Sequence, residues 1–286
     1  MIFKKVVIVG IGLLGGSIGL IVKEKKLAQL VVGLLRRQEA CEEALALGIV
    51  DRATCDIQEA FSQADFVIFA TPISVMKEIL VKALPYIDKK TLITDVGSVK
   101  EFIVNTFENL LNEKACFVGS HPIAGSDKSG MQFSQNSLFQ NALCILTPSE
   151  NTVSEVTQKI TTFWESLGMH IMIMSPQDHD KMMAYVSHMP HVIAACLVNS
   201  LMRLGQDGLK ECLKTAGKGW RDTTRIAGSS GRIWADILAA NTDNILEGLK
   251  EFRVQVDDII EKIEYKKRQE ILDIFENANK IKRLEE

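Results

Sequence analysis

The sequence predicts an α/β protein with an N-terminal Rossmann fold, a doubly wound and mostly parallel sheet, followed by a C-terminal all-helical domain. Three observations lead to this prediction. A glycine-rich turn directly follows an apolar run near the N-terminus, apolar runs of strand length alternate with helical stretches as far as residue 175, and only helical periodicity follows. We therefore expect two domains, a dinucleotide-binding domain at residues 1–175 and a helical domain at residues 176–286.

The first expected element is an apolar strand at residues 6–9, which leads into Gly10-Ile11-Gly12-Leu13-Leu14-Gly15. An apolar helical stretch follows at once, and this is the strand–turn–helix context that a dinucleotide-binding fingerprint requires. The first glycine allows the tight turn, the second lets the backbone approach a pyrophosphate, and the third lets the helix pack closely on the strand. The first helical turn, with Leu13 and Leu14, presents backbone N–H groups to the phosphates. The alternative is a glycine-rich turn without a ligand.

The end of the second expected strand, residues 30–35, bears on the choice of dinucleotide. Folds that bind NAD usually carry Asp or Glu about 20 residues after the fingerprint, where the carboxylate binds the ribose hydroxyls. Here the strand ends in Leu35-Arg36-Arg37, without an acid. Because guanidinium groups match a phosphate in charge and geometry, Arg36 and Arg37 favour NADP over NAD. The alternative is that both arginines are solvated surface residues.

Five more strands are expected, separated by helical stretches of suitable length. They lie at residues 64–70, 91–96, 115–119, 142–147 and 170–174. In doubly wound sheets, ligands bind outside the carboxyl ends of the strands. Three of these ends carry residues that could meet in one crevice, namely Thr71-Pro72, Ser98 and His121.

Composition and charge exclude several classes of protein. The 286 residues carry a formal net charge of −3, which implies no basic surface for nucleic acid. There is no apolar run of about 18 residues, so we expect no membrane-spanning segment, and the N-terminus enters the fold without a signal peptide. The six cysteines are scattered without a C-x-x-C pair, so disulfides and a zinc site are not expected, and a reducing cytoplasmic setting fits.

Three of the five histidines lie in unusual settings. His121 lies in a small-residue loop after an expected strand, where it could act as a general base beside a nicotinamide; the alternative is a histidine satisfied by backbone groups. His188 and His191 are three residues apart, on one face of an expected helix. Substrate or orienting contacts are favoured for them, and the alternatives are a metal site and a structural role. The other two histidines are interpreted as structural: His170 and His179.

A polar loop at residues 217–226 concentrates cations and hydroxyls inside the otherwise apolar helical domain. Its residue Arg225 could bind a substrate carboxylate through two parallel hydrogen bonds. The alternative is an intramolecular ion pair between Asp222 and Arg225.

The helical half also carries a long apolar stripe. Its members recur at spacings of three or four residues: Ile245, Leu249, Phe252, Val256, Ile259 and Ile263. A single layer of helices cannot bury all such stripes, so we expect a homodimer built through the helical domain.

Taken together and in this order, five motifs resemble those of the prephenate/arogenate dehydrogenase family of tyrosine biosynthesis. They are the glycine fingerprint, Asp95-Val96-Gly97-Ser98-Val99-Lys100, Gly119-Ser120-His121-Pro122-Ile123-Ala124-Gly125, Ser187-His188-Met189-Pro190-His191 and Arg221-Asp222-Thr223-Thr224-Arg225. The resemblance covers essentially the whole chain. It implies a Rossmann domain joined to a helical dimerisation domain. It also implies a reaction in which the ring hydroxyl of prephenate or arogenate is oxidised by hydride transfer to NAD or NADP, with loss of the ring carboxylate as CO2.

The resemblance further implies roles for individual residues. His121 is the catalytic histidine, Ser98 is its hydroxyl partner near the reacting oxygen, and Arg225 binds a substrate carboxylate. Leu35 stands where an acid is usual, as in the members that use NADP, and Asp127 stands where many relatives carry Glu. We expect no metal, because aromatisation of the ring makes the loss of CO2 favourable. The other implied substrate-binding residues are Ser126, Asp127, His188, His191 and Trp234.

Two other functions share part of this pattern. A dehydrogenase of the β-hydroxyacid or 6-phosphogluconate type has the same two-domain plan, but it would rely on a catalytic lysine in the helical domain, where this chain offers histidines and an arginine. A dinucleotide sensor without catalysis would keep the glycine fingerprint but would not need Ser98 and His121 at neighbouring strand ends.

Overall fold

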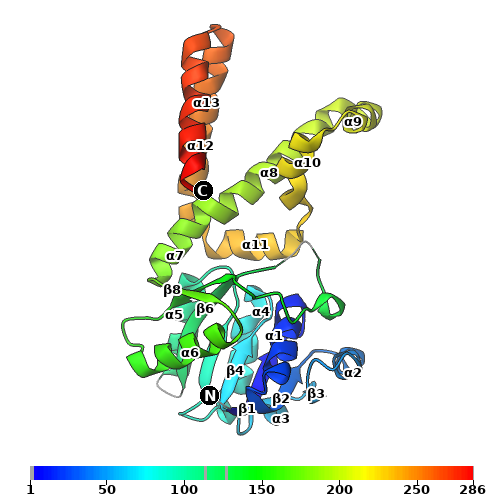
Figure 1. Ribbon diagram of the computed structural model, residues 1–286, viewed down its shortest axis with the longest axis vertical. Coiled ribbons are helices and arrows are strands. Elements are labelled where there is room, and N and C mark those ends of the chain that lie inside the picture. The colour runs from blue at the N-terminus through cyan, green and yellow to red at the C-terminus, as the bar shows by residue number, and fades with distance from the viewer. Residues whose placement is uncertain (1–2, 113–114, 126–127, 286) are drawn as a thin grey trace. The chain divides into compact units, whose positions relative to one another are not determined.

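The computed structural model describes residues 3–112, 115–125 and 128–285. Within these residues, eight strands form one sheet in the order β3-β2-β1-β4-β5-β6-β7-β8 (Figure 1). All neighbouring strands are parallel except β6 and β7, which are antiparallel. The predicted mostly parallel Rossmann sheet is therefore confirmed. The strands are β1 (Phe3–Val9), β2 (Ala28–Leu34), β3 (Arg52–Thr54), β4 (Phe66–Phe69), β5 (Leu92–Asp95), β6 (Cys116–Ile123), β7 (Leu143–Thr147) and β8 (His170–Ile173).

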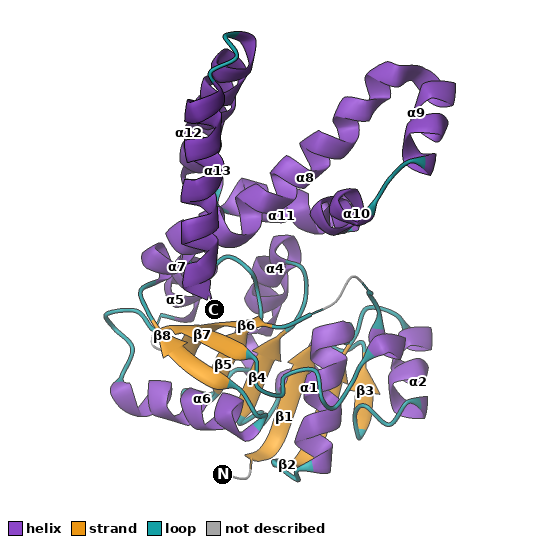
Figure 2. Cartoon of the chain, turned by 45° about the horizontal axis from the view of Figure 1, so that its top comes forward, coloured by secondary structure: helices purple, strands orange, loops and turns teal. Residues whose placement is uncertain are grey.

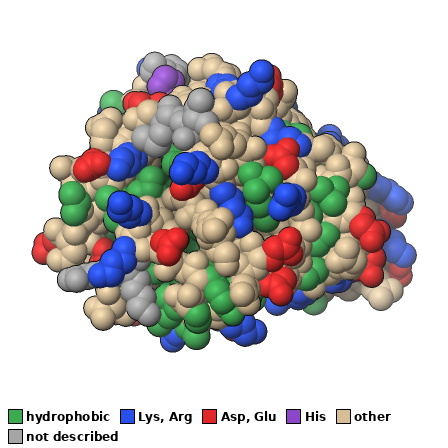
Figure 3. All heavy atoms as spheres, turned by 90° about the horizontal axis from the view of Figure 1, so that it is seen from below, with side chains coloured by type: hydrophobic (Ala, Val, Ile, Leu, Met, Phe, Trp, Pro, Cys, Tyr) green, Lys and Arg blue, Asp and Glu red, His purple; other side chains and the backbone are tan. Residues whose placement is uncertain are grey.

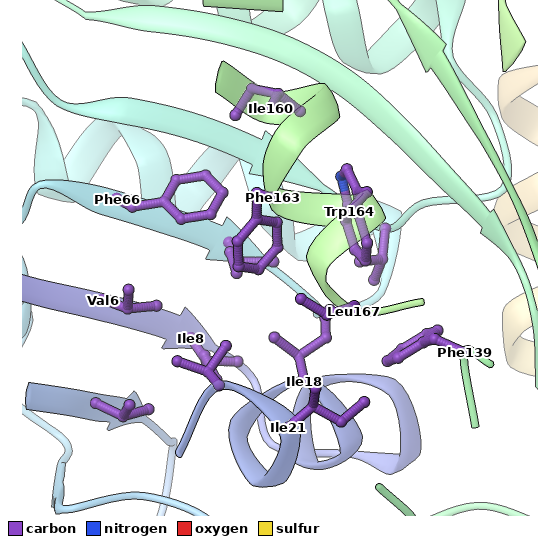
Figure 4. Packing of buried hydrophobic residues seen from close by; sticks show 14 of the residues in the cluster. Val6, Ile8, Ile18, Ile21, Phe66, Phe139, Ile160, Phe163, Trp164 and Leu167 are labelled. Carbon is purple, nitrogen blue, oxygen red and sulfur yellow. The ribbon is translucent and has the colours of Figure 1, made fainter. Parts of the chain in front are cut away.

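Helices cover both faces of the sheet (Figure 2). Successive residues of the buried strands point to opposite faces, and both sets are apolar, so each face needs a layer of helices to bury it. In β1, Val6 and Ile8 belong to one hydrophobic cluster, whereas Val7 and Val9 belong to the other. Figure 4 shows the first cluster, in which Phe163 and Trp164 pack near Phe66 and the first helix. The covering helices are α1 (Leu13–Glu24), α2 (Gln38–Ala46), α3 (Ile57–Phe61), α4 (Ile73–Ala83), α5 (Glu101–Leu111) and α6 (Ser154–Ser166), with short 3-10 turns η1 (Leu84–Tyr86) and η2 (Met131–Phe133).

From residue 176 onward the described chain is helical, as predicted. Contacts divide the chain into two compact units, Met1–Asn241 and Thr242–Glu286, and the domain boundary predicted at residue 175 stays a prediction. The first unit contains α7 (Pro176–Met183), the π-helical turn η3 (Ala184–His188), α8 (Met189–Ser200), η4 (Leu201–Leu204), α9 (Gly205–Lys214), α10 (Lys218–Thr224), η5 (Arg225–Gly228) and α11 (Gly231–Ala240). In the second unit, α12 (Thr242–Glu264) and α13 (Arg268–Lys282) pack against each other, and the turn η6 (Arg283–Glu285) follows.

Strand β6 departs from the prediction in a way that matters for the site. It was expected to end at residue 119, but it continues through His121 to Ile123 because β7 pairs with its second half, with His121 opposite Ile145. His121 therefore lies within a strand and not in the loop after it. Pro122 is tolerated there because β5 pairs with β6 only as far as Val118, so this stretch has a single neighbouring strand.

The surface mixes charges of both signs. On the face shown in Figure 3, basic and acidic side chains are interspersed among polar and apolar ones. Among the residues that the structure describes, no helix combines the length and the apolar character needed to cross a membrane.

Candidate active site

The glycine fingerprint adopts the geometry that its sequence predicts. Gly10 has a φ of 90°, and a Cβ atom there would lie 2.6 Å from the Thr71 Cγ2 atom. A Cβ atom on Gly15 would lie 2.1 Å from the Gly10 carbonyl oxygen, so α1 packs directly on the turn. A Cβ atom on Gly12 would meet nothing within 4 Å. The backbone at Gly12, the N-cap of α1, thus leaves room for a ligand to approach, as a pyrophosphate would.

A cavity of about 640 Å³ opens beside this turn, at the carboxyl ends of β1, β2 and β4. Gly10, Arg36, Thr71 and Pro72 line it, whereas Arg37 is exposed outside the lining. The Oγ1 atom of Thr71 is buried and finds no hydrogen-bond partner among the described residues. A mostly apolar cavity with three cationic side chains, Arg36, Lys82 and Arg232, and an unpartnered hydroxyl fits the adenosine end of a dinucleotide. Leu13 and Leu14 form the first turn of α1, next to the space at Gly12.

Two imidazoles and a carboxylate form a hydrogen-bonded relay behind His121. The Nδ1 atom of His121 lies 2.8 Å from the Nε2 atom of His179, and the Nδ1 atom of His179 lies 2.7 Å from a carboxylate oxygen of Asp180. The same carboxylate accepts hydrogen bonds from the backbone N–H groups of Lys100, at 2.7 Å, and Glu101, at 2.9 Å. Asp180 on α7 therefore binds the first turn of α5 and anchors the relay to it.

The direction of these hydrogen bonds assigns the tautomer of each ring. Asp180 accepts, so the Nδ1 atom of His179 must donate and its Nε2 atom must accept. The Nδ1 atom of His121 then donates to His179, which leaves the Nε2 atom of His121 with a lone pair. Nε2 is thus the atom of His121 that can accept a proton from a ligand.

Burial keeps these imidazoles neutral. It lowers the pKa of His121 well below the usual 6.5, and the nearby His179, Lys100 and His188 lower it further. Burial also lowers the pKa of His179 to about 3. Both rings are therefore uncharged at neutral pH, which is the state that a general base requires.

A buried ion pair joins the turn after β5 to the strand that carries His121. The Lys100 ammonium, fully buried, donates to the Asp95 carboxylate and to the Ser120 carbonyl oxygen, the latter at 2.8 Å. Asp95 also accepts from the backbone N–H groups of Gly97, at 2.7 Å, and Ser120, at 3.1 Å. Burial raises the pKa of Asp95 and lowers that of Lys100, and their mutual attraction opposes both shifts. The pair holds the turn with Ser98 against the residue that precedes His121.

His188 lies in the π-helical turn η3, a local irregularity that is common at functional sites. The side-chain amide of Asn241 donates to the Asp180 carbonyl oxygen at 2.8 Å and lies 3.2 Å from the His188 Nδ1 atom. The Nδ1 atom of His188 therefore accepts, and its Nε2 atom carries the proton. That Nε2 atom is buried and has no hydrogen-bond partner among the described residues. Burial lowers the pKa of His188 to about 4, although Asp180 and the backbone of Ser98 favour the charged form.

A second group of predicted residues lies along α8 and α11. The His191 ring stacks on Trp234, with centroids 3.9 Å apart and planes at 27°. Its Nδ1 atom donates to the Ser187 carbonyl oxygen at 2.8 Å, which leaves Nε2 as an acceptor. Burial lowers the pKa of His191, and Arg225 contributes to that shift. Arg225 itself is exposed at the start of η5, and Asp222 pairs with Lys218, so the alternative Asp222–Arg225 pair is wrong.

Two predicted substrate residues, Ser126 and Asp127, lie outside the described residues. The interpretation of His179 as structural stays a prediction, and the structure adds that this residue is hydrogen-bonded to His121. His170, on the edge strand β8, is exposed. The sequence analysis did not foresee the contacts of Lys100, which it named only within a motif, and it missed Asp180 and Asn241. In the sequence, each of these is a polar residue beside an apolar run or beside another polar residue. Many surface residues share this setting, so it could not single them out.

The site combines three features: a dinucleotide-type glycine turn, a cavity at the carboxyl edge of a Rossmann sheet, and a neutral histidine at the same edge. This combination defines the class of nicotinamide-dependent dehydrogenases. Two family models narrow this class. Residues 18–173 match the model described as "Prephenate dehydrogenase, nucleotide-binding domain", and residues 175–277 match "Prephenate dehydrogenase, dimerization domain". The chain belongs to the prephenate dehydrogenase family.

Individual relatives agree with this assignment. The chain is 35% identical to prephenate dehydrogenase of Bacillus subtilis, over 96% of this chain and 74% of that protein. It is 34% identical to cyclohexadienyl dehydrogenase of Zymomonas mobilis, over 88% of this chain and 85% of that protein. The family resemblance deduced from the sequence motifs is therefore confirmed.

Solved structures show the same fold. Prephenate dehydrogenase of Aquifex aeolicus, in complex with hydroxyphenyl propionate and NAD+, superposes with a TM-score of 0.91 at 32% identity and covers 100% of this chain and 99% of its own. Arogenate dehydrogenase of Synechocystis gives a TM-score of 0.81 at 30% identity, covering 96% of this chain and 98% of its own. A 3-hydroxyisobutyrate dehydrogenase of Mycobacterium tuberculosis, with 14% identity and a TM-score of 0.52, shares the fold alone.

Proposed function

We propose that this enzyme oxidises and decarboxylates prephenate, arogenate or both in tyrosine biosynthesis, with transfer of a hydride to a nicotinamide dinucleotide. The products would be 4-hydroxyphenylpyruvate from prephenate and tyrosine from arogenate, each with CO2. The observation that carries the proposal is the relay Asp180–His179–His121, which sets a neutral His121 with its Nε2 atom as the proton acceptor. The names of the relatives supply the substrate class.

In this reaction the chain's own residues handle the proton of the ring hydroxyl. A bound nicotinamide supplies the acceptor for the hydride that leaves the carbon bearing that hydroxyl. His121 Nε2 accepts the O–H proton as the carbonyl bond forms, while Ser98 binds the same oxygen and fixes its orientation. The C–C bond to the ring carboxylate then breaks, its electron pair completes the aromatic ring, and the proton held by His121 returns to the oxygen to give the phenol. The relay holds the His121 ring in the productive tautomer throughout.

Cationic and donor groups at the helical side would bind the carboxylates of the substrate. We assign this role to the exposed guanidinium of Arg225 and to the Nε2–H group of His188. His191 and Trp234, stacked on each other, would form one wall of the substrate pocket. Ser126 and Asp127 stay proposed substrate residues on the strength of the sequence resemblance.

We further propose that NADP is preferred over NAD. Arg36 lines the cavity at the end of β2, and Leu35 stands where an acid would repel a phosphate. The A. aeolicus structure contains NAD+, so the assay must compare both dinucleotides.

We also propose that the enzyme is a cytoplasmic homodimer. Its second family model is a dimerization domain. In the first unit, Val186 and Met202 are 69% and 73% exposed, and in the second unit Ile263 and Phe275 are 61% and 67% exposed. Burial of such exposed apolar side chains against a second copy of the chain would favour association. Light scattering at micromolar concentration should give the mass of a dimer, and a stable monomer would refute the assignment.

One assay tests the proposed reaction. The purified protein is mixed with prephenate or arogenate and with NADP or NAD, and the reduced nicotinamide is followed by its absorbance together with the release of CO2. We expect reduction and CO2 release with at least one pair of substrates, and neither with 3-hydroxyisobutyrate. Reduction without CO2, or no reduction with any pair, would overturn the proposal.

A further inference from the structure

Two cysteine thiols, 14 residues apart in the sequence, touch each other beside the proposed cofactor cavity. Cys41 lies on α2 and is 1% exposed, whereas Cys55 lies in the turn between β3 and α3 and is exposed. Their Sγ atoms are 3.7 Å apart. All six cysteines lie within the described residues, and among these residues the structure shows this one contact between cysteine sulfurs.

The position of the pair connects it to the cavity. Cys55 and Arg36 both line the cavity, at the edge where β2 and β3 end side by side, with Leu34 opposite Thr54. Helix α2, which carries Cys41, has Arg37 as its N-cap. The contact between the two thiols therefore lies between the two segments that follow β2 and β3, and Cys55 lines the cavity.

The two sulfur atoms need only a small movement to bond. A disulfide bond is about 2.05 Å long, so the Sγ atoms must approach by about 1.7 Å from their separation of 3.7 Å. Cys55 is the exposed member of the pair, in a turn, so rotation of its side chain can supply much of this movement. The thiol that an oxidant reaches first is therefore Cys55, with Cys41 behind it.

We propose that Cys41 and Cys55 form a reversible redox-modification site that a peroxide closes into an intramolecular disulfide. The Cys55 sulfur attacks the peroxide, the O–O bond breaks, and a sulfenic acid and one water molecule form. The Cys41 sulfur then attacks the sulfenic sulfur, so that the S–S bond forms and the second oxygen leaves as water. Two thiols are oxidised, and one hydrogen peroxide molecule is reduced to two water molecules. Burial and the contact with Cys55 raise the pKa of Cys41 to about 11, so Cys41 is the less reactive thiol toward peroxide and Cys55 is the one oxidised first.

A bound dinucleotide should slow the oxidation of Cys55. This expectation rests on the proposed binding of the dinucleotide in this cavity. A dinucleotide that covers the wall with Cys55 shields that thiol from peroxide. At a dinucleotide concentration about ten times its Kd, about one eleventh of the enzyme is free, so the rate of disulfide formation should fall about tenfold.

The test treats the full-length enzyme with a small excess of hydrogen peroxide, and then counts thiols and maps peptides by mass spectrometry without reducing agent. We expect a cross-linked pair of peptides containing Cys41 and Cys55, loss of two of the six thiols, and full reversal by dithiothreitol. The Cys212→Ser variant, which removes another exposed thiol, should still form the cross-link, whereas Cys55→Ser should not. Wild-type enzyme in which Cys55 ends as a sulfinic acid or in an intermolecular disulfide, with Cys41 unmodified, would overturn the proposal.

The same reaction with saturating NADP or NAD separates the two proposals. Protection by either dinucleotide supports the coupling, and an unchanged rate of cross-linking with bound dinucleotide overturns it. If the cross-link and the protection both occur but no dehydrogenase activity is found, the proposed reaction fails while the redox site stands.

Discussion

The charged and titratable groups of this protein fall into two regions that differ in burial. At the carboxyl ends of β5 and β6, Asp95, Lys100, His121, His179 and Asp180 are buried and bonded to one another or to backbone groups. By contrast, the three predicted ligand-binding arginines, of which Arg36 lines the cavity, are exposed to solvent: Arg36, Arg37 and Arg225. The groups of the buried region are already partnered within the protein, whereas in the proposed site the exposed cations would acquire their partners from the ligand.

Because of this difference in burial, charged side chains in the two regions contribute to different properties of the enzyme, namely stability and ligand binding. A buried charge that loses its partner cannot be rehydrated, so removal of one member of a buried pair is strongly destabilising. An exposed cation loses little when it stands alone in water, and its value appears only when a ligand anion binds. Substitutions in the buried region should therefore change kcat and stability, and substitutions of the exposed arginines should change KM.

The largest expected effect is that of His121→Asn on turnover. The Asn side chain can still donate to His179, so the relay keeps its hydrogen bond, but it offers no lone pair on nitrogen to accept a proton. We expect kcat to fall by about 10²–10⁴, the usual contribution of a positioned general base. Steady-state kinetics with the substrate found active would measure this loss, while His170→Asn, at an exposed histidine, serves as the control. A near-native kcat in His121→Asn would place the base elsewhere, with His188 as the first candidate.

Lys100→Met should have the next largest effect, on stability. Methionine fills a similar volume but leaves the buried Asp95 carboxylate without its cation. We expect a loss of about 3–5 kcal/mol in the free energy of unfolding, measured by urea denaturation. Lys214→Met, at an exposed lysine paired with Glu211, should stay close to wild type. Equal midpoints for the two variants would mean that burial does not distinguish the two regions.

Arg225→Ala should act on substrate binding alone. The exposed guanidinium makes no contribution to the buried network, so kcat and thermal stability should hardly change. Loss of a charge-assisted hydrogen bond of about 1.5–3 kcal/mol should raise KM for the dicarboxylate substrate by about 10–100-fold. Arg203→Ala, another exposed arginine of the helical segment, is the matched control. If KM for the substrate does not change, Arg225 lies outside the site.

Arg36→Ala should lower kcat/KM for NADP and leave that for NAD nearly constant. A phosphate contact of about 1–2 kcal/mol corresponds to a change of roughly 5- to 30-fold. Arg37→Ala should have a smaller effect, because Arg37 lies outside the cavity lining. A wild-type enzyme that already prefers NAD would contradict the proposed role of both arginines.

The sequence predicts the fold well because the fold depends on local patterns. The fingerprint and the alternating apolar runs indicate the parallel sheet, and the end of β2 supplies one of the cations that line the cavity, Arg36. Strand β3 escaped prediction because three residues, Arg52–Thr54, are too few to show a periodicity. The antiparallel pairing of β6 with β7, which places His121 inside a strand, depends on a distant segment.

The buried relay could not be predicted for a related reason. His179 meets His121 across 58 residues of sequence, and it does so only because α7 packs against α5. In the sequence, His179 and Asp180 are an ordinary polar pair in the first turns of a helix. Their significance comes from the Asp180 carboxylate, which binds the N-terminus of α5 and so fixes the position of the neighbouring imidazole.

The smallest expected effect concerns the pH dependence of the wild type and of His179→Gln. His121 must be neutral to accept a proton, and its pKa is lowered well below 6.5, so kcat/KM of the wild type should stay level below pH 6.5 and fall only as the pH drops through the lowered pKa. Stability changes in the same direction, because the unfolded chain binds protons at His179 and His188 below pH 6.5 while the folded chain, with values of about 3 and about 4, does not. In the His179→Gln variant, the glutamine side chain can bridge His121 and Asp180, so kcat should fall by only about 2- to 10-fold. Since His179 contributes to the lowered pKa of His121, this substitution should move the acid limb of the kcat/KM profile to higher pH. A limb that stays in place while kcat falls would show that His179 only positions His121, and a limb above pH 6.5 in the wild type would contradict the neutral relay.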